Sequence, residues 1–213
     1  GIARFRDPGP DGVAARKAVE DALDLKQTEF NAQGTEMNQR YDSAAVIADA
    51  DSQPEKWQRD PQLHVQPTTR PGAKIPHVWL VDHKGLRVST LDVTGRGAFS
   101  LVTGLAGGHW VDAATALDLP FLKIVVTGRA DAQDLYCDWQ RIREIDEAGV
   151  LLVRPDGHIA WRSIGAAANV SDARAQLVTA LAAILDNSDL SAASVAALPA
   201  KDPVSAPEAA MSR

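Results

Sequence analysis

The chain has 213 residues, a formal net charge of −6 and a hydrophobic fraction of 45%, which is ordinary for a globular protein and sufficient for a core. The negative charge and the lack of a basic run argue against nucleic acid as a partner, because phosphate contacts need clustered Lys and Arg. The longest apolar runs, such as Val150–Val153, are far too short to cross a bilayer, so no membrane partner is expected.

Cysteine usage and the first residue bear on compartment and completeness. Cys137 is the single cysteine, so an internal disulfide is excluded and a reducing, cytoplasmic location is expected. Residue 1 is Gly rather than Met, which either a residue left by tag removal or a cut from a longer protein would explain.

The first 72 residues predict a helix, a short strand and a linker. Residues 11–37 carry apolar side chains near helical spacing, and Gly34 is suited to end that helix. Alternating apolar residues predict a strand at 40–48. Residues 50–72 are polar and contain several prolines, which is typical of a linker.

The rest of the chain alternates between strands and helices. Residues 77–81 and 86–91 flank a Lys84-Gly85 turn and predict a hairpin. Beyond it the pattern predicts strand, helix, strand, helix, strand, strand and helix, in that order. The expected ranges are 98–102, 110–117, 123–126, 134–145, 150–153, 158–161 and a last helix ending at 185.

Two local signals mark the last part of this pattern. Residues 154–157 read Arg-Pro-Asp-Gly between apolar runs and predict a hairpin turn, since Pro fixes φ and Gly accepts a positive φ. Either Asn169 or Ser171 is suited to cap the last helix, whose sheet-facing residues are expected to be Leu177, Leu181, Ile184 and Leu185. Residues 188–213 are rich in Ala, Ser and Pro, which predicts an extended, disordered tail.

This order of elements is typical of a thioredoxin-like βαβ unit followed by a ββα unit. A working thioredoxin carries two cysteines between its first strand and first helix, whereas residues 103–110 contain none. We therefore expect an α/β fold with a thioredoxin-like domain at 73–187 that lacks the redox pair. Such a domain serves packing or partner contacts rather than thiol exchange.

Apart from the missing cysteine pair, the sequence offers only weak candidates for a reactive or binding site. Gly104, Gly107 and Gly108 stand where a phosphate-binding loop would precede a helix, but their spacing matches neither the dinucleotide fingerprint nor the P-loop. A structural turn is the preferred interpretation. Cys137 falls on an expected helix, so a small apolar role is preferred to that of a nucleophile, and a one-cysteine peroxidase ranks last among the hypotheses.

Histidines, charges and tryptophans also favour structural roles. No ligand spacing predicts a metal site among the five histidines, and His77 is expected to set the start of its strand through a hydrogen bond. The charged residues at 141–147 are expected to form a solvated helix face. The five tryptophans lie near element ends and suit core or interface anchors.

Several runs are more specific when they are taken together. Residues 70–80 read Arg-Pro-Gly-Ala-Lys-Ile-Pro-His-Val-Trp-Leu, and residues 153–162 read Val-Arg-Pro-Asp-Gly-His-Ile-Ala-Trp-Arg. Ser-Thr-Leu-Asp at 89–92, Phe-Ser-Leu-Val-Thr-Gly at 99–104 and Asp-Leu-Tyr at 134–136 lie between them. These runs resemble the C-terminal region of the FAD-dependent aromatic hydroxylases, the phenol and 2,4-dichlorophenol monooxygenases. Residues 30–34 and 40–46 resemble the segment that closes the flavin domain of that family.

The resemblance implies a full-length enzyme that hydroxylates a phenol or chlorophenol with FAD, NAD(P)H and O₂. It also implies a thioredoxin-like C-terminal domain without redox cysteines, with residues 1–49 as the end of the flavin domain. Its expected partners are the N-terminal flavin domain of the same protein and a second subunit in a homo-oligomer, such as a dimer. In this family glycine is expected where Asn38 and Cys137 stand.

No functional residue can be carried over from that family. Neither a Gly-rich flavin fingerprint nor a Gly-Asp motif occurs in the sequence, so we assign no catalytic, cofactor-binding or metal residue and expect this chain alone to be inactive. The alternative hypothesis is a free-standing, redox-inactive thioredoxin-like binding protein.

Overall fold

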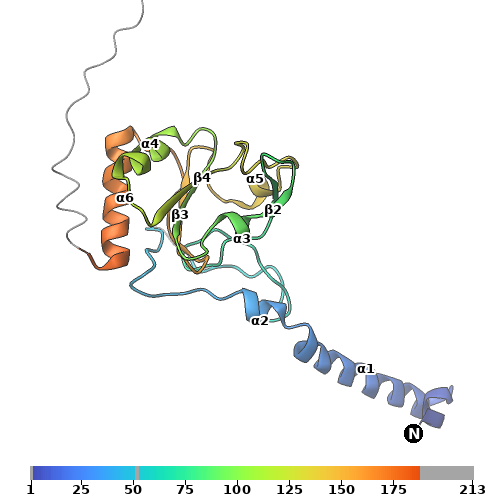
Figure 1. Ribbon diagram of the computed structural model, residues 1–213. Helices are drawn as coiled ribbons and strands as arrows, with labels where there is room; N and C mark the ends of the chain where they lie inside the picture. Colours follow the sequence, from blue (N-terminus) through green and yellow to red (C-terminus); the bar gives the residue numbers. More distant parts are fainter. Residues whose placement is uncertain (1, 51–52, 188–213) are drawn as a thin grey trace, which may run out of the picture.

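A computed structural model describes residues 2–50 and 53–187, which form a mixed α/β structure (Figure 1). The predicted tail at 188–213 lies outside the described residues. No helix in the described part of the chain is long and apolar enough to span a membrane.

A four-stranded sheet organises the structure, with strand order β4-β3-β5-β6. The strands are β3 (Phe99–Thr103), β4 (Leu122–Val126), β5 (Val150–Val153) and β6 (Ile159–Ser163). β3 pairs in parallel with β4, and α4 (Gly108–Leu117) connects them. β3 and β5 are antiparallel, as are β5 and β6. The predicted order of elements from residue 98 onward is confirmed.

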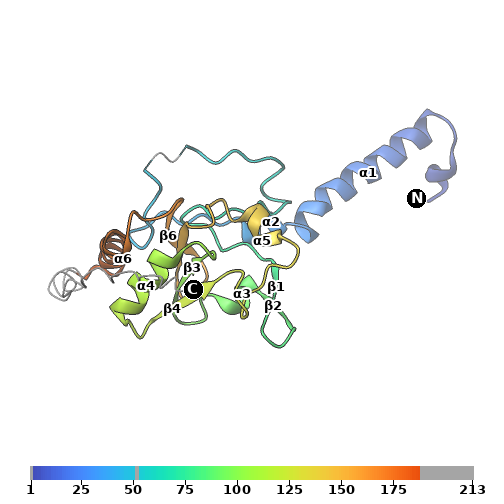
Figure 2. The same cartoon turned by 90° about the horizontal axis from the view of Figure 1, so that it is seen from above.

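The two faces of the sheet carry separate hydrophobic clusters, because successive side chains of a strand point to opposite faces. On one face, α4 and α6 (Val170–Leu185) lie together (Figure 2) and pack Trp110 and Leu177 against Leu101. On the other face, Trp139 packs with Val102. β3 and β5 are buried along their whole length, which places the core at the centre of the sheet.

A hairpin of β1 (Trp79–Val81) and β2 (Arg87–Ser89) covers part of the second face. The strand expected at 86–91 ends early, because Ser89 caps a short helix, α3 (Thr90–Val93). The Ser89 hydroxyl accepts from the Leu91 N–H at 3.0 Å, and the Asp92 carboxylate accepts from the Ser89 N–H at 3.1 Å. This capping box outweighs the alternating pattern of the strand.

The prediction of a single helix at 11–37 is wrong. The segment contains α1 (Pro10–Phe30) and α2 (Gln33–Met37), preceded by a 3₁₀ turn, η1 (Ile2–Arg6). Gly34 lies inside α2 rather than ending a helix, and a Cβ there would overlap the carbonyl of Pro61. The close approach of two backbones, not the end of a helix, therefore explains why residue 34 is a glycine.

The strand expected at 40–48 is also wrong. Arg40 forms one isolated bridge with Ala73, and the Ile47 N–H donates to the Ala160 carbonyl at 2.7 Å. These two contacts reach different segments, so no continuous ladder forms despite the alternating apolar residues.

The helix expected at 134–145 shortens to α5 (Asp138–Ile142). The Asp134 carboxylate accepts from the N–H groups of Asp138 at 2.9 Å and Gln140 at 3.0 Å, so it starts the helix four residues later than expected. Glu144 has a φ of +50° and breaks the helix beyond Ile142. Leu135 precedes the helix and is 58% exposed.

The signals at the end of the chain are largely confirmed. Residues 154–157 form the hairpin turn, with Gly157 at a φ of +84°. Asn169, not Ser171, caps α6, since its side chain accepts from the Asp172 N–H at 2.9 Å. Four residues were expected to face the sheet, and the prediction is wrong for Leu185, which is 38% exposed at the end of the helix.

Candidate functional site

The glycine-rich loop runs from the end of β3 to the start of α4. The Glu147 carboxylate accepts from the Leu105 N–H at 2.6 Å, and a Cβ on Gly104 would overlap this carboxylate. A Cβ on Gly107 would overlap the hydroxyl of Thr103, which donates to the Gly149 carbonyl at 2.6 Å. Both glycines are therefore required by close packing of the loop.

Helix α4 fastens the loop to the same segment, residues 147–149, through Trp110. Trp110 is fully buried, and its indole N–H donates to the Ala148 carbonyl at 2.9 Å. A Cβ on Gly108, in contrast, would meet open space. A protein carboxylate thus takes the place that a phosphate would need at Leu105, and this geometry supports the structural interpretation of the loop.

The charged residues at 141–147 are not the solvated helix face that the sequence predicts, because α5 ends at Ile142. Arg143 is buried and its guanidinium donates to Glu147 at 2.6 Å, which orients the carboxylate that holds the loop. The Glu144 carboxylate accepts from the Thr68 hydroxyl at 2.7 Å and the Thr69 N–H at 2.9 Å. Arg143, Glu144 and Glu147 therefore join segments of the fold, although Arg141, Glu144 and Asp146 are exposed, as the prediction of solvated charges expects.

Arg162 on β6 extends this network to the N-terminal part of the chain. Its guanidinium donates to Asp49 at 2.6 Å and to Glu144 at 3.2 Å, while its side chain is only 10% exposed. Thr69 is fully buried beside it and donates through its hydroxyl to the Arg143 carbonyl. We call Asp49, Thr69, Glu144 and Arg162 the clasp, because they tie residues 49 and 69 to the end of the sheet.

A second junction forms around His158, which follows the turn between β5 and β6. Its ring packs edge-on against Tyr41, with 4.6 Å between centroids, and Nδ1 lies 3.4 Å from the Asp156 carboxylate. Neither ring nitrogen has a hydrogen-bond partner in the described part of the chain. Burial lowers the pKa of His158; the Asp156 carboxylate opposes that shift, whereas Lys74 and Arg154 reinforce it.

The other candidate residues do not converge on a reaction centre. His77 bonds the Ser89 hydroxyl at 2.7 Å, which confirms its predicted role at the start of the strand. His83 pairs with Asp131 at 2.8 Å on the surface. Within residues 2–50 and 53–187, no group of three His, Cys, Asp or Glu side chains could hold a metal ion.

Cys137 is exposed and lies just before α5, not within a helix as predicted. Its φ of +56° falls in the left-handed region that favours glycine, which gives a physical reason for the glycine that the family resemblance leads us to expect here. Asn38 has an ordinary φ of −91°. Its side-chain amide instead donates to the carbonyls of Pro61 at 2.8 Å and His64 at 2.7 Å.

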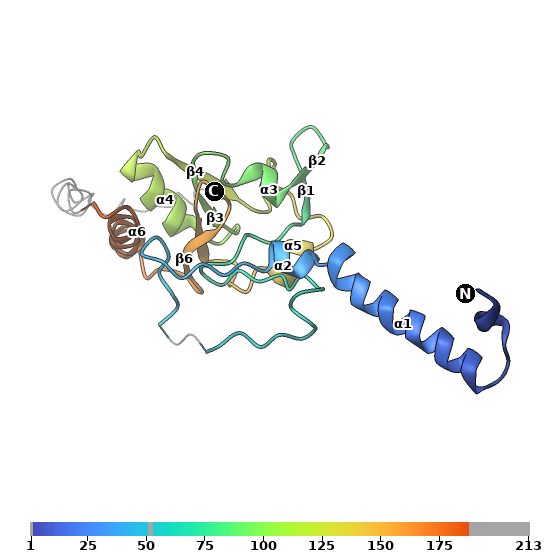
Figure 3. The same cartoon turned by 90° about the horizontal axis from the view of Figure 1, so that it is seen from below.

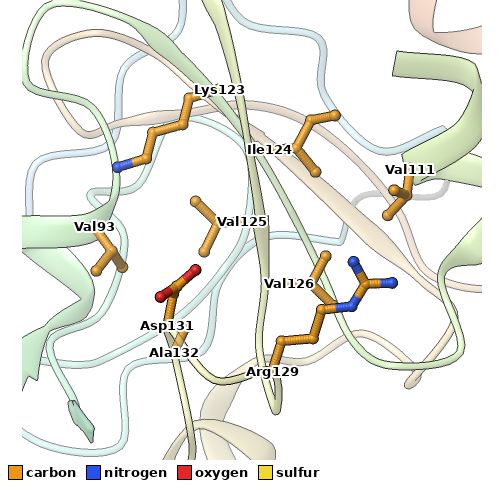
Figure 4. A pocket seen from close by; sticks show the side chains of 9 residues that line it. All are labelled: Val93, Val111, Lys123, Ile124, Val125, Val126, Arg129, Asp131 and Ala132. Atoms are coloured by element: carbon orange, nitrogen blue, oxygen red, sulfur yellow. The ribbon is translucent and has the colours of Figure 1, made fainter. Parts of the chain in front are cut away.

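A pocket of about 490 Å³ follows the outer strand β4 (Figure 4). Its walls are mainly aliphatic, with Val93 and Val111 on either side of the strand, and Lys123 and Arg129 are the basic residues among its lining. Asp131, the acidic residue of this pocket, is already bonded by His83. The pocket lacks the convergent polar groups that a catalytic site needs.

Comparison with known proteins places these features in a family. The family described as aromatic-ring hydroxylase, C-terminal, matches residues 68–188. The chain belongs to this family. The matched region begins one residue before Thr69 of the clasp and includes the whole four-stranded sheet.

Relatives of this aromatic-ring hydroxylase domain are considerably longer. A 2,4-dichlorophenol 6-monooxygenase from Delftia acidovorans is 46% identical over 76% of the chain, which spans 28% of that protein. A phenol 2-monooxygenase from Pseudomonas sp. (strain EST1001) is 47% identical over 76% of the chain and 27% of its own length. The flavin-dependent monooxygenase PieE, solved with FAD and substrate, superposes with a TM-score of 0.76 at 35% identity over 87% of the chain and 32% of PieE.

The sequence pattern did not reveal the clasp or the role of Glu147 in this domain. Asp49 lies 113 positions from Arg162, and Leu105 lies 42 from Glu147. Local periodicity reports only which face a residue occupies within one element. It carries no signal for an ion pair between elements.

Proposed function

We propose that this chain is the C-terminal region of an FAD- and NAD(P)H-dependent hydroxylase of phenol or a chlorophenol. The observation that carries the proposal is the identity of 46% and 47%, over three quarters of the chain, to a 2,4-dichlorophenol 6-monooxygenase and a phenol 2-monooxygenase. The chain spans less than a third of either relative. The flavin and the reacting ring would then be bound mainly by the rest of the polypeptide.

The turn between β3 and α4 does not fit the pyrophosphate of a flavin. The glycine-rich turn that most resembles a dinucleotide cradle is filled by Glu147 and by the hydroxyl of Thr103. A pyrophosphate at the start of α4 would meet the Glu147 carboxylate, and like charges repel. We therefore derive no chemical step of the flavin from residues of this chain.

The role proposed for this chain is structural. The parallel β3–α4–β4 unit, followed by the β5–β6 hairpin and α6, supports the thioredoxin-like assignment for residues 73–187. Glu147 and the two tightly packed glycines occupy the region where thiol chemistry would take place. Residues 1–49 would be the end of the flavin domain and 50–72 a connection, and a second subunit would complete a homo-oligomer.

The test compares this chain with the full product of its gene. The gene product should carry a flavin absorption band and oxidise NAD(P)H in the presence of phenol or 2,4-dichlorophenol. This chain alone should be colourless and inactive. Flavin-dependent turnover by this chain alone, or a flavin-free gene product no longer than the chain, would contradict the proposal; the latter would favour a free-standing binding protein.

A further inference from the structure

One exposed apolar surface lies beside the β1–β2 hairpin. Trp79 is 46% exposed, Leu135 58% and Tyr136 77%, and together with Val81 and Arg87 they line a hollow of about 340 Å³. We call Trp79, Leu135 and Tyr136 the hairpin patch. Exposed aromatic and aliphatic side chains that gather around a hollow are typical of a protein interface.

The hairpin patch is held in place by its own surroundings. The Trp79 ring packs between the His77 ring, with 4.8 Å between centroids, and the Arg87 guanidinium, 4.5 Å from the ring centroid. His77 is itself fixed by its bond to Ser89. Trp79 therefore has a defined orientation before any partner binds, which lowers the entropic cost of association.

The loop that carries Leu135 and Tyr136 is equally constrained. Val81 and Gln133 exchange two backbone hydrogen bonds of 2.9 Å, which set this loop beside the hairpin. At its other end the Asp134 carboxylate caps α5, and Arg141 donates to the Tyr136 carbonyl at 2.9 Å. The backbone conformation of this loop therefore keeps the two side chains exposed.

The direction of the chain indicates what covers the hairpin patch. α1 leaves the domain at the end that holds the hairpin and α5, whereas α4 and α6 lie at the opposite end (Figures 1 and 3). Leu23, Leu25 and Phe30 of α1 are each more than 60% exposed. The upstream polypeptide would therefore meet apolar side chains both on α1 and at this end of the domain.

We propose that the hairpin patch docks onto an apolar surface of the polypeptide that precedes residue 1. This inference rests on the proposed function, in which that polypeptide is the flavin domain of the same protein. It assigns to Trp79, Leu135 and Tyr136 the contact that fixes the orientation of the C-terminal domain.

Cys137 supplies a reporter, because it follows Tyr136 and its thiol is exposed in this chain. The full-length gene product is alkylated with iodoacetamide, and labelling of Cys137 is followed by peptide mass mapping. In the native protein we expect labelling at least about ten times slower than in the double variant Leu135→Ser/Tyr136→Ser. Ile164→Ser, which changes a residue 46% exposed on another part of the surface, should leave the protection unchanged.

Each outcome separates this inference from the proposed function. Fast labelling in a native protein that retains flavin and activity would overturn the inference and leave the proposed function intact. Protection that disappears on dilution would mean that a second copy covers the patch, which also overturns it. The flavin spectrum and circular dichroism of each variant report folding, and the single variant Tyr136→Ser replaces the double variant if the latter does not fold.

Discussion

The sheet domain and the N-terminal helix α1 obey the same rules of local structure but differ in where their apolar side chains go. In the sheet domain, Trp110, Leu101 and Leu177 lose almost all contact with water. In α1, Leu23 and Phe30 remain 62% and 77% exposed. Helices are stabilised in proteins mainly by packing of an apolar face, so α1 gains little stability from packing against the described residues.

The largest effect should come from the core of the sheet domain. Trp110→Ala removes a fully buried ring and the hydrogen bond to Ala148, so the free energy of unfolding should fall by about 3–5 kcal/mol. Leu23→Ala on α1 should change it by less than about 0.5 kcal/mol, because that side chain is already hydrated. Urea unfolding followed by circular dichroism measures both; similar losses would contradict the contrast.

The clasp, which ties residues 49 and 69 to the end of the sheet, should come second. Arg162→Ala leaves the Asp49 and Glu144 carboxylates without their cation, and we expect a loss of about 2–3 kcal/mol. This is below the range for fully buried pairs, because both carboxylates are partly exposed. Arg96→Ala is the matched control, since it breaks an exposed pair with Asp92 and should cost no more than about 0.5 kcal/mol. Equal losses in urea unfolding would argue against the clasp.

The junction at His158 should make stability depend on pH. Burial lowers the pKa of His158, so the folded state disfavours the protonated ring that the unfolded chain accepts. Its contribution is therefore neutral well above the ordinary pKa of about 6.5 and becomes destabilising as the pH falls below it.

Unfolding free energies measured between pH 5 and pH 7.5 test this junction. His158→Gln should flatten the decline on acidification, and Tyr41→Ala should reduce it by exposing the ring to water. An unchanged slope in both variants would show that His158 does not titrate as inferred.

The smallest effect should appear at the loop before α5. Cys137→Gly relieves a left-handed backbone at a φ of +56° and should raise the free energy of unfolding by about 0.5–1 kcal/mol. Asn38→Gly provides the comparison. Asn38 lacks this strain, and the substitution removes three side-chain hydrogen bonds. Thermal unfolding should therefore show a lower melting temperature for Asn38→Gly and a higher one for Cys137→Gly.

The differences between prediction and structure have local physical causes. The expected strand at 86–91 gave way to the Ser89 capping box, and the expected helix at 134–145 shortened because Asp134 binds the N–H groups of Asp138 and Gln140. Both signals are present in the sequence. The apolar pattern alone predicts longer elements, whereas side-chain capping decides where a helix begins.

The sequence by itself determined the elements of the sheet, the turn at 154–157 and the family resemblance. Each depends on residues close together in the chain, where hydrophobic period and turn chemistry act directly. Only the tertiary structure decided that Glu147 closes the glycine-rich loop, that Arg162 clasps Asp49 and that Tyr41 covers His158. These contacts join residues 42 to 117 positions apart, and such pairs exist only after the core has brought their elements together.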